Sequence, residues 1–155
     1  MTEAIVFTLP GTPAGKGRPR FRSMQLGNGA TVPRAYTDDK TRAAEQSVLA
    51  AYLVAGGAKR RPHEGPVEVS ITATFTAAES WPKWKRLLAA CGLWPHTKKP
   101  DIDNVTKAVF DGLNGRAYID DAQIVRLTAA KLYGEAASTR IEITFLPIPE
   151  RSNTK

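Results

Sequence analysis

Apolar and polar residues alternate over several segments of the chain, and this pattern predicts four strands. Residues 67–75 carry an apolar side chain at every second position and are rich in β-branched residues, which is typical of a strand with one buried face. Residues 138–146 alternate in the same way. The shorter apolar runs at residues 5–9 and 123–133 complete the predicted strands.

Apolar residues at helical spacing predict three helices. The first begins after Thr37, a good N-cap residue, and runs to about residue 55, before a Gly-Gly pair. The second is short and begins near Ser80, and its apolar stripe includes Trp81 and Trp84. These two rings could stack on bases, but we expect the stripe to face the core. The third spans residues 101–113 and ends at Asn114-Gly115.

The order strand, helix, strand, helix, helix, strand, strand predicts an α/β (α+β) fold, with helices packed on a small mixed sheet of about four strands. A chain of 155 residues suits one core, so we expect residues 1–147 to form a single domain and residues 148–155 a flexible tail. Residues 14–36 are rich in Gly, Pro and Arg. They predict a long functional loop, with a short hairpin around residues 27–29.

The composition, 42% apolar residues, excludes a disordered chain. Its apolar stretches are too short to cross a bilayer and it begins without a signal-peptide pattern, so we expect a cytoplasmic protein with no membrane partner. Cys91 is the only cysteine, which fits a reducing compartment. We expect its side chain to be buried, as free cysteines usually are.

A net charge of +7 and a pI of about 9.8 favour a polyanionic partner. Cations alternate with Gly, Pro and Phe in one segment before residue 23, and two lysines precede an acidic motif at residue 101. Such segments suit contacts along a phosphate backbone. The residues that we expect to bind DNA are Lys16, Arg18, Arg20, Arg22, Lys98 and Lys99.

Two carboxylate pairs carry the candidate chemistry. Asp101 and Asp103 flank the start of the third predicted helix, where one of them could simply be an N-cap, and Asp120 and Asp121 precede a strand, where they could simply form a turn. If the sheet brings the two pairs together, their mutual repulsion would raise their pKa values. A divalent cation removes that repulsion, and oxygen-only ligands favour Mg²⁺ or Mn²⁺ over zinc.

Three neighbouring residues have two interpretations each. Lys107 lies four residues after Asp103 on the same helix face, so it either forms a surface ion pair or contacts the scissile phosphate. Asp111 continues that face, and we expect it to be solvated rather than catalytic. We expect His96, in a basic loop, to face solvent as a contact residue rather than to act as a general base.

Residues 99–107 (KPDIDNVTK), 110–114 (FDGLN) and 118–124 (YIDDAQI) resemble, in this order, the signature of RusA-type Holliday-junction resolvases. Residues 15–21 (GKGRPRF) resemble the opening of the phage-type branch of that family. The resemblance implies a homodimer with a small mixed α/β fold that cuts two opposing strands of a four-way DNA junction with Mg²⁺, for which we expect Mn²⁺ to substitute, and without an organic cofactor.

The resemblance also assigns roles to residues. It implies that the essential carboxylates are Asp101, Asp103 and Asp121, with Asp120 in the same metal site, and that the important lysine is Lys107. Two alternatives remain: a non-catalytic protein that binds DNA junctions, and a nuclease for flaps or other branched nucleic acids. A pure binding protein has no reason to place acids beside its basic loops, so the acids favour a nuclease.

Overall fold

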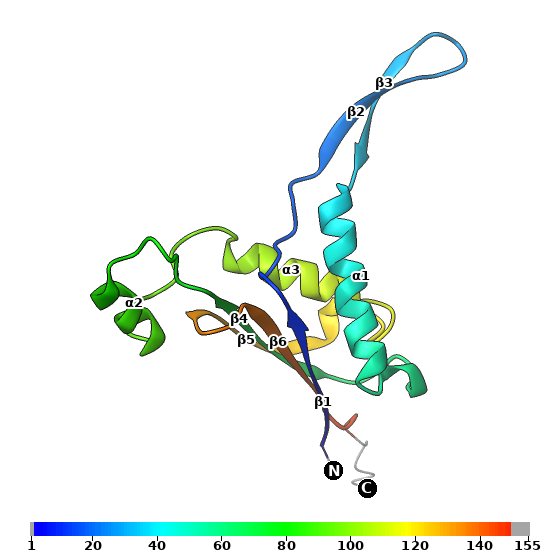
Figure 1. Ribbon diagram of the computed structural model, residues 1–155. Coiled ribbons are helices and arrows are strands. Elements are labelled where there is room, and N and C mark those ends of the chain that lie inside the picture. The colour runs from blue at the N-terminus through cyan, green and yellow to red at the C-terminus, as the bar shows by residue number, and fades with distance from the viewer. Residues whose placement is uncertain (1, 150–155) are drawn as a thin grey trace, which may run out of the picture.

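A four-stranded mixed sheet organises the chain (Figure 1). Its strands lie in the order β1-β6-β4-β5, with β4 and β5 parallel and the other neighbours antiparallel. This confirms the predicted fold class. The computed structural model describes residues 2–149. The strands are β1 (Glu3–Pro10), β4 (Val67–Phe75), β5 (Ile124–Tyr133) and β6 (Ser138–Phe145).

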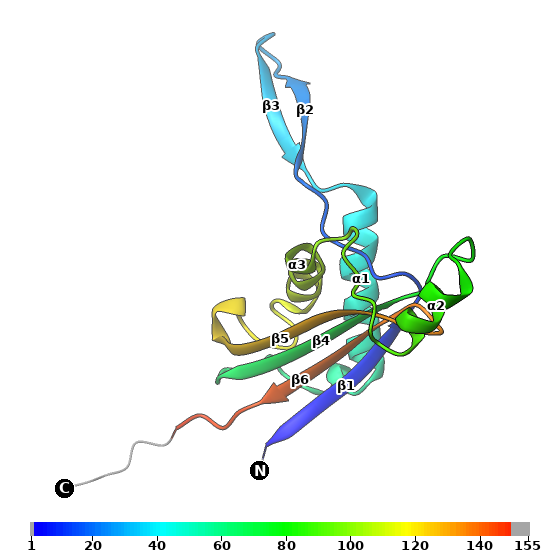
Figure 2. The ribbon, with the colours of Figure 1, turned by 90° about the vertical axis from the view of Figure 1, so that its left-hand side faces the viewer.

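Two helices, α1 (Asp39–Val54) and α3 (Ile102–Leu113), cover one face of this sheet (Figure 2). The alternation along β4 explains why, because every second side chain of that strand is buried beneath the helices. Ile71 of β4 packs there beside Ile141 and Ile143 of β6. The opposite face carries polar side chains such as Glu68 and Glu142. The sheet therefore has one apolar face and one polar face, as the sequence pattern predicts.

The two helices approach each other closely at Gly112. A Cβ atom on Gly112 would lie 2.7 Å from the backbone oxygen of Glu45 and 2.9 Å from Cβ of Val48. Only a residue without a side chain fits there. This contact fixes α3 against α1 and so fixes the position of the acidic motif at the start of α3.

The N-cap of α1 is Asp38, not Thr37 as the sequence suggested. The carboxylate of Asp38 accepts a hydrogen bond from the backbone N–H of Thr41 at 2.9 Å, which satisfies one of the free donors of the first turn. The hydrogen bonds from Thr41 lower the pKa of Asp38. The prediction was wrong by one residue because both residue types can cap a helix.

The predicted long loop is largely a two-stranded ribbon, formed by β2 (Arg20–Gln25) and β3 (Thr31–Tyr36). The turn lies at residues 26–30, so the hairpin expected around residues 27–29 is confirmed, and it is longer than expected. Every residue of the two strands is exposed. The ribbon projects away from the sheet and its helices (Figures 1 and 2).

The helix α2 (Lys83–Ala90) lies beyond the end of the sheet and differs from its prediction. It begins after Pro82 rather than near Ser80. Its apolar stripe does not enter the core, since Trp84 is 58% exposed and Ala89 is the buried residue of the helix. Cys91, expected to be buried, is exposed. Both expectations failed because α2 packs against the end of the sheet through few residues.

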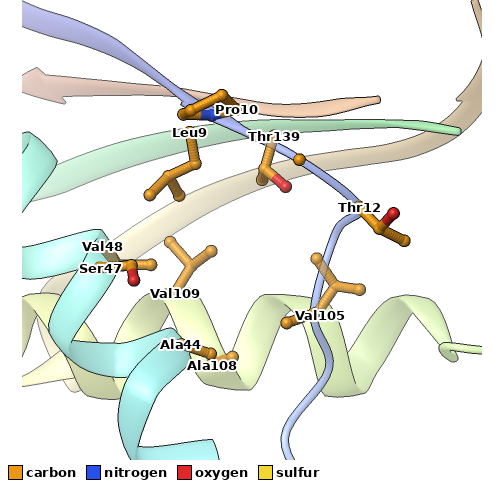
Figure 3. Close-up of a pocket in the computed structure, with 12 residues that line it drawn as sticks. Leu9, Pro10, Thr12, Ala44, Ser47, Val48, Val105, Ala108, Val109 and Thr139 are labelled. Carbon is orange, nitrogen blue, oxygen red and sulfur yellow. The ribbon is translucent and has the colours of Figure 1, made fainter. Parts of the chain in front are cut away.

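An apolar cavity of about 130 Å³ lies between β1, α1 and α3 (Figure 3). Leu9, Val48, Val105 and Val109 form its walls, and none of the described residues that line it carries a charge. It is therefore a packing defect of the core rather than a site for polar chemistry. Two short 3₁₀ turns, η1 (Gly57–Lys59) and η2 (Asp121–Gln123), complete the fold.

No helix within residues 2–149 is long and apolar enough to cross a bilayer. Residues 150–155 of the predicted tail lie outside the described residues.

Candidate active site

Asp101 and Asp103 stand at the start of α3 with their carboxylates accessible. Asp101 occupies the N-cap position, but its side chain makes no capping hydrogen bond. Instead it accepts a hydrogen bond from Nζ of Lys99 at 2.7 Å. Asp103 lies in the first turn, with an oxygen 3.9 Å from Nζ of Lys107. Capping therefore explains neither carboxylate, and both remain available to a ligand.

Positive charge surrounds Asp101. The hydrogen bond from Lys99 holds the pKa of Asp101 below its usual value, and the charges of Lys131 and Arg18 act in the same direction. Asp101 is therefore ionised at neutral pH, which is the form that binds a metal ion. The same cations are placed to neutralise a phosphate bound beside the carboxylate.

The backbone of the motif is held from two sides. Nζ of Lys131, on β5, donates hydrogen bonds to the carbonyl oxygens of Lys98 and Pro100 at 2.6 and 3.0 Å. On the other side, the backbone N–H of Lys16 donates to the carbonyl oxygen of Asn104 at 2.9 Å. The acidic motif thus sits on a rigid support from the sheet and the N-terminal segment.

The side chain of Lys16 is engaged inside the chain. Its ammonium donates a hydrogen bond to the carboxylate of Asp111 and lies 3.8 Å from an oxygen of Glu45, and the bond to Asp111 raises its pKa. Lys16 thus forms ion pairs with α1 and α3 in this structure, and its contact with DNA stays a prediction. Asp111, predicted to be solvated, is its partner.

The second carboxylate pair lies at the turn that begins η2. Asp120 caps this turn, since its side chain accepts from the N–H of Ala122 at 2.8 Å. Gln123 returns the contact by accepting from the N–H of Asp120 at 2.9 Å, as in a capping box. The turn expected at this pair is confirmed. Asp121 is exposed, and none of the hydrogen bonds or ion pairs found within residues 2–149 uses its carboxylate.

The two carboxylate pairs lie at opposite ends of α3. Asp101 and Asp103 precede its first turn, whereas the hydroxyl of Tyr118, just before Asp120, donates to the carbonyl of Phe110 in its last turn. A helix of this length spans about 18 Å. Accordingly, the described residues contain no group of three or more His, Cys, Asp or Glu side chains able to hold a metal ion. Within residues 2–149 of one chain, the condition that the sheet brings the two carboxylate pairs together is therefore not met.

The second pair has a buried neighbour that the sequence did not single out. Burial raises the pKa of the Tyr118 hydroxyl, and the charges of Asp121, Asp111 and Asp120 add to the effect. Tyr118 is fully buried, so it anchors the turn that carries Asp120 and Asp121. The pattern of apolar and polar residues around Tyr118 is too short to predict that its side chain is buried.

His96 is not the solvent-facing residue that the sequence suggested. Its ring is 9% exposed and stacks on Phe75 with ring centroids 3.7 Å apart. Burial, together with the charge of Lys131, lowers its pKa. Local sequence patterns could not predict this stacking, because the two residues lie on separate segments.

The remaining predicted DNA-binding residues are exposed: Arg18, Arg20, Arg22, Lys98 and Lys99. In the ribbon, Arg22 lies opposite Arg34, and Arg20 lies opposite Tyr36. Residues opposite each other share a face of the ribbon, so Arg20, Arg22 and Arg34 form a basic stripe along it. Arg34 was not predicted, because only the strand pairing brings it beside the other two.

Comparisons with known proteins identify the family of this chain. The family model described as endodeoxyribonuclease RusA matches residues 10–144. The uncharacterized protein YqaN of Bacillus subtilis (strain 168) is 33% identical over 146 residues, which cover 91% of this chain and 94% of that protein. The crossover junction endodeoxyribonuclease rusA of Lactococcus phage r1t is 34% identical over 82 residues, covering 51% of this chain and 54% of the phage protein. The chain therefore belongs to the RusA family of endodeoxyribonucleases, enzymes that hydrolyse phosphodiester bonds in DNA.

Proposed function

We propose that this protein cuts four-way DNA junctions with Mg²⁺, and that it does so as a two-fold dimer. The observation that carries the proposal is the start of α3, where Asp101 and Asp103 present accessible carboxylates among cations. Phosphodiester cleavage needs this combination: acids that hold a metal ion, and positive charge that receives the phosphate.

The donor set at the start of α3 fits Mg²⁺. This ion binds through one or two carboxylates, keeps several waters, and takes further oxygen ligands from phosphate. Asp101 and Asp103 supply the carboxylates, and their side chains are 48% and 65% exposed. Bound there, the ion would lower the pKa of a water ligand and polarise the phosphate. Lys107 would neutralise charge that develops on the phosphate.

A second copy of the chain would complete this site. β5 is an edge strand of the sheet, and an exposed edge offers unpaired backbone groups to another strand. Apolar side chains line this edge, and three of them are large and exposed: Val125 (63%), Leu127 (44%) and Leu132 (46%). Exposed apolar side chains gathered along one strand favour a partner that covers them.

Antiparallel pairing of β5 with its copy about a two-fold axis would bring the two carboxylate pairs together. Asp121 lies at the start of β5, and Lys131, which holds the backbone beside Asp101, lies near its end. In an antiparallel pair the start of one strand meets the end of the other. Each dimer would then hold two composite sites, each with Asp101 and Asp103 from one copy and Asp120 and Asp121 from the other, which suits paired cuts in a two-fold junction.

The ribbon of β2 and β3, with its basic stripe, would bind the arms of the DNA junction. A two-stranded ribbon fits the major groove of B-DNA, and the stripe of Arg20, Arg22 and Arg34 supplies contacts to phosphates. Arg18 would act nearer the cut, because its charge already reaches Asp101.

A cleavage assay on a synthetic four-way junction tests the proposal, with wild type and Asp103→Asn compared in Mg²⁺ and in EDTA. The amide keeps the shape of the side chain and removes its charge. We expect paired cuts by wild type in Mg²⁺ alone, and junction binding without cutting by the variant. A wild-type protein that binds junctions but cuts with neither Mg²⁺ nor Mn²⁺ would instead be a junction-binding protein. Preferential cutting of flaps would identify a different branched substrate.

A further inference from the structure

The helix α2 lies beyond the end of the sheet (Figures 1 and 2), and aromatic side chains from the segments on either side of it contact the last residues of β4 and β5. His96 stacks on Phe75 and lies 5.0 Å from the ring of Tyr133, and Trp81 lies 5.2 Å from the same tyrosine. Trp94 extends the cluster at 6.4 Å from Trp81. Phe75 belongs to the hydrophobic core and Tyr133 packs against it, so this cluster, here called the aromatic lobe, extends the core beyond the end of the sheet.

A pocket of about 150 Å³ opens within this lobe. Phe75, Trp81, His96 and Tyr133 supply its aromatic walls, and Thr76 and Lys98 supply polar groups. A cavity of about 150 Å³ holds one benzene ring. The pocket therefore has the size for a single planar ring, with aromatic side chains and polar groups around it.

A buried polar atom of His96 is a second indication that this pocket binds a ligand. Its side chain is more than nine-tenths buried, yet its Nδ1 atom has no hydrogen-bond partner among the described residues. A buried polar atom without a partner is rare in folded proteins and often marks a functional site. Because burial lowers its pKa, the ring is neutral at pH 7, so it suits an uncharged heteroaromatic group better than a phosphate.

Lys98 lines the pocket, and Lys85 lies over one of its aromatic walls. Nζ of Lys85 lies 3.9 Å from the ring centroid of Trp81, and Nζ of Lys98 lies 5.7 Å from it. Such cations interact favourably with aromatic rings, and lysine side chains can also contact phosphates. Aromatic rings beside cations are the combination that binds single-stranded nucleic acids.

We infer that this pocket receives one unpaired pyrimidine base of the DNA strand that is cut. The chain connects the two sites directly, since Lys98 at the pocket is three residues before Asp101, a reach of about 10 Å at most. The captured base would belong to a nucleotide close to the scissile phosphate. Enzymes that modify a base provide a precedent, since they extrude that base into a pocket where hydrogen bonds and stacking hold it. This inference rests on the proposed function, because it places the pocket on the same strand.

Tryptophan fluorescence tests the inference without any cleavage. All three tryptophans of the chain, Trp81, Trp84 and Trp94, lie in this lobe, so their emission reports on it alone. The titrant is a short oligothymidylate, and its comparison is an oligomer of equal length with abasic sites in place of the bases. Both are titrated in EDTA. We expect quenching by the oligothymidylate and about tenfold weaker binding of the abasic oligomer.

Two blocking variants and one control link that signal to the pocket. Ala78→Leu and Thr76→Leu fill the pocket from exposed positions that line it. Ala50→Leu makes the same kind of change at an exposed position of α1. We expect about tenfold weaker oligothymidylate binding in both blocking variants and wild-type binding in the control.

The outcomes separate this inference from the proposed function. Equal binding of the two oligomers, or wild-type binding by both blocking variants, overturns the inference even if the enzyme cuts junctions. Base-dependent binding that the blocking variants abolish supports it, even in a protein that cuts nothing.

Discussion

The ammonium of Lys16 donates a hydrogen bond to the carboxylate of Asp111, 95 positions away in the sequence. This ion pair ties the segment before the basic ribbon to the last turn of α3. It therefore holds the cations of the ribbon in a fixed position relative to the acids at the start of the same helix.

Breaking this ion pair should lower stability modestly. We expect Lys16→Met and Asp111→Asn each to reduce the free energy of unfolding by about 1 kcal/mol, because the pair is partly solvated. The double variant should lose less than the sum of the two single variants. Urea denaturation measures all three. Strictly additive losses would show that the two side chains do not interact.

The same ion pair predicts a pH dependence. The pKa of Lys16 is raised above its ordinary value of 10.5 in the folded chain. Its stabilising contribution is therefore complete below pH 10.5 and is lost as the pH rises through the higher folded pKa. Wild type should lose more stability than Lys16→Met between pH 9 and pH 12. Parallel stability curves for the two proteins would contradict this assignment.

The pKa of Asp101 should depend on Lys99. In wild type it lies below the ordinary value of 3.8, chiefly because Lys99 donates a hydrogen bond to it. Lys99→Met should therefore raise the pKa of Asp101, as followed by carboxyl NMR shifts of the metal-free protein. Lys83→Met, a lysine of α2 that is absent from the causes of this shift, is the matched control. An unchanged titration in Lys99→Met would mean that the hydrogen bond does not persist in solution.

Gly112 should tolerate no side chain. A Cβ atom there would overlap the backbone of Glu45, and overpacking of this kind typically costs about 1–3 kcal/mol. We expect Gly112→Ala to lower the urea midpoint clearly. Gly27→Ala, with open space around the new atom, should change the midpoint little. Equal midpoints for both variants would show that the two helices can separate without cost.

The ribbon should dominate salt-dependent DNA affinity. We expect Arg22→Gln and Arg34→Gln each to reduce the slope of log K against log salt concentration, by about 0.9 for each phosphate that the variant no longer neutralises. Arg140→Gln serves as the control, because Arg140 pairs with Glu142 on the polar face of the sheet. If the control variant reduces the slope as much as the ribbon variants do, the arginines of the ribbon are not the main phosphate contacts.

Patterns of apolar and polar residues along short segments predicted most of the fold. The features that were not predicted depend on contacts between segments far apart in the sequence. The alternation of β4 and the helical spacing of α3 were sufficient because each is set by neighbouring residues. The partners of Lys16 and His96 were not predictable, since each contact joins distant segments. The sequence singled out the four aspartates as candidates, but it did not predict their spatial arrangement. No sequence pattern reports that α3 separates them.

A second copy of the chain is central to the proposed active site, because it would supply Asp120 and Asp121. Mixing two inactive variants, Asp103→Asn and Asp121→Asn, tests this most directly on a four-way junction in Mg²⁺. In a mixed dimer with composite sites, one site carries both substitutions and the other carries none. We predict that each variant alone is inactive and that the mixture nicks one strand. A mixture that stays inactive under conditions where wild type cuts and the variants exchange subunits would contradict the shared site.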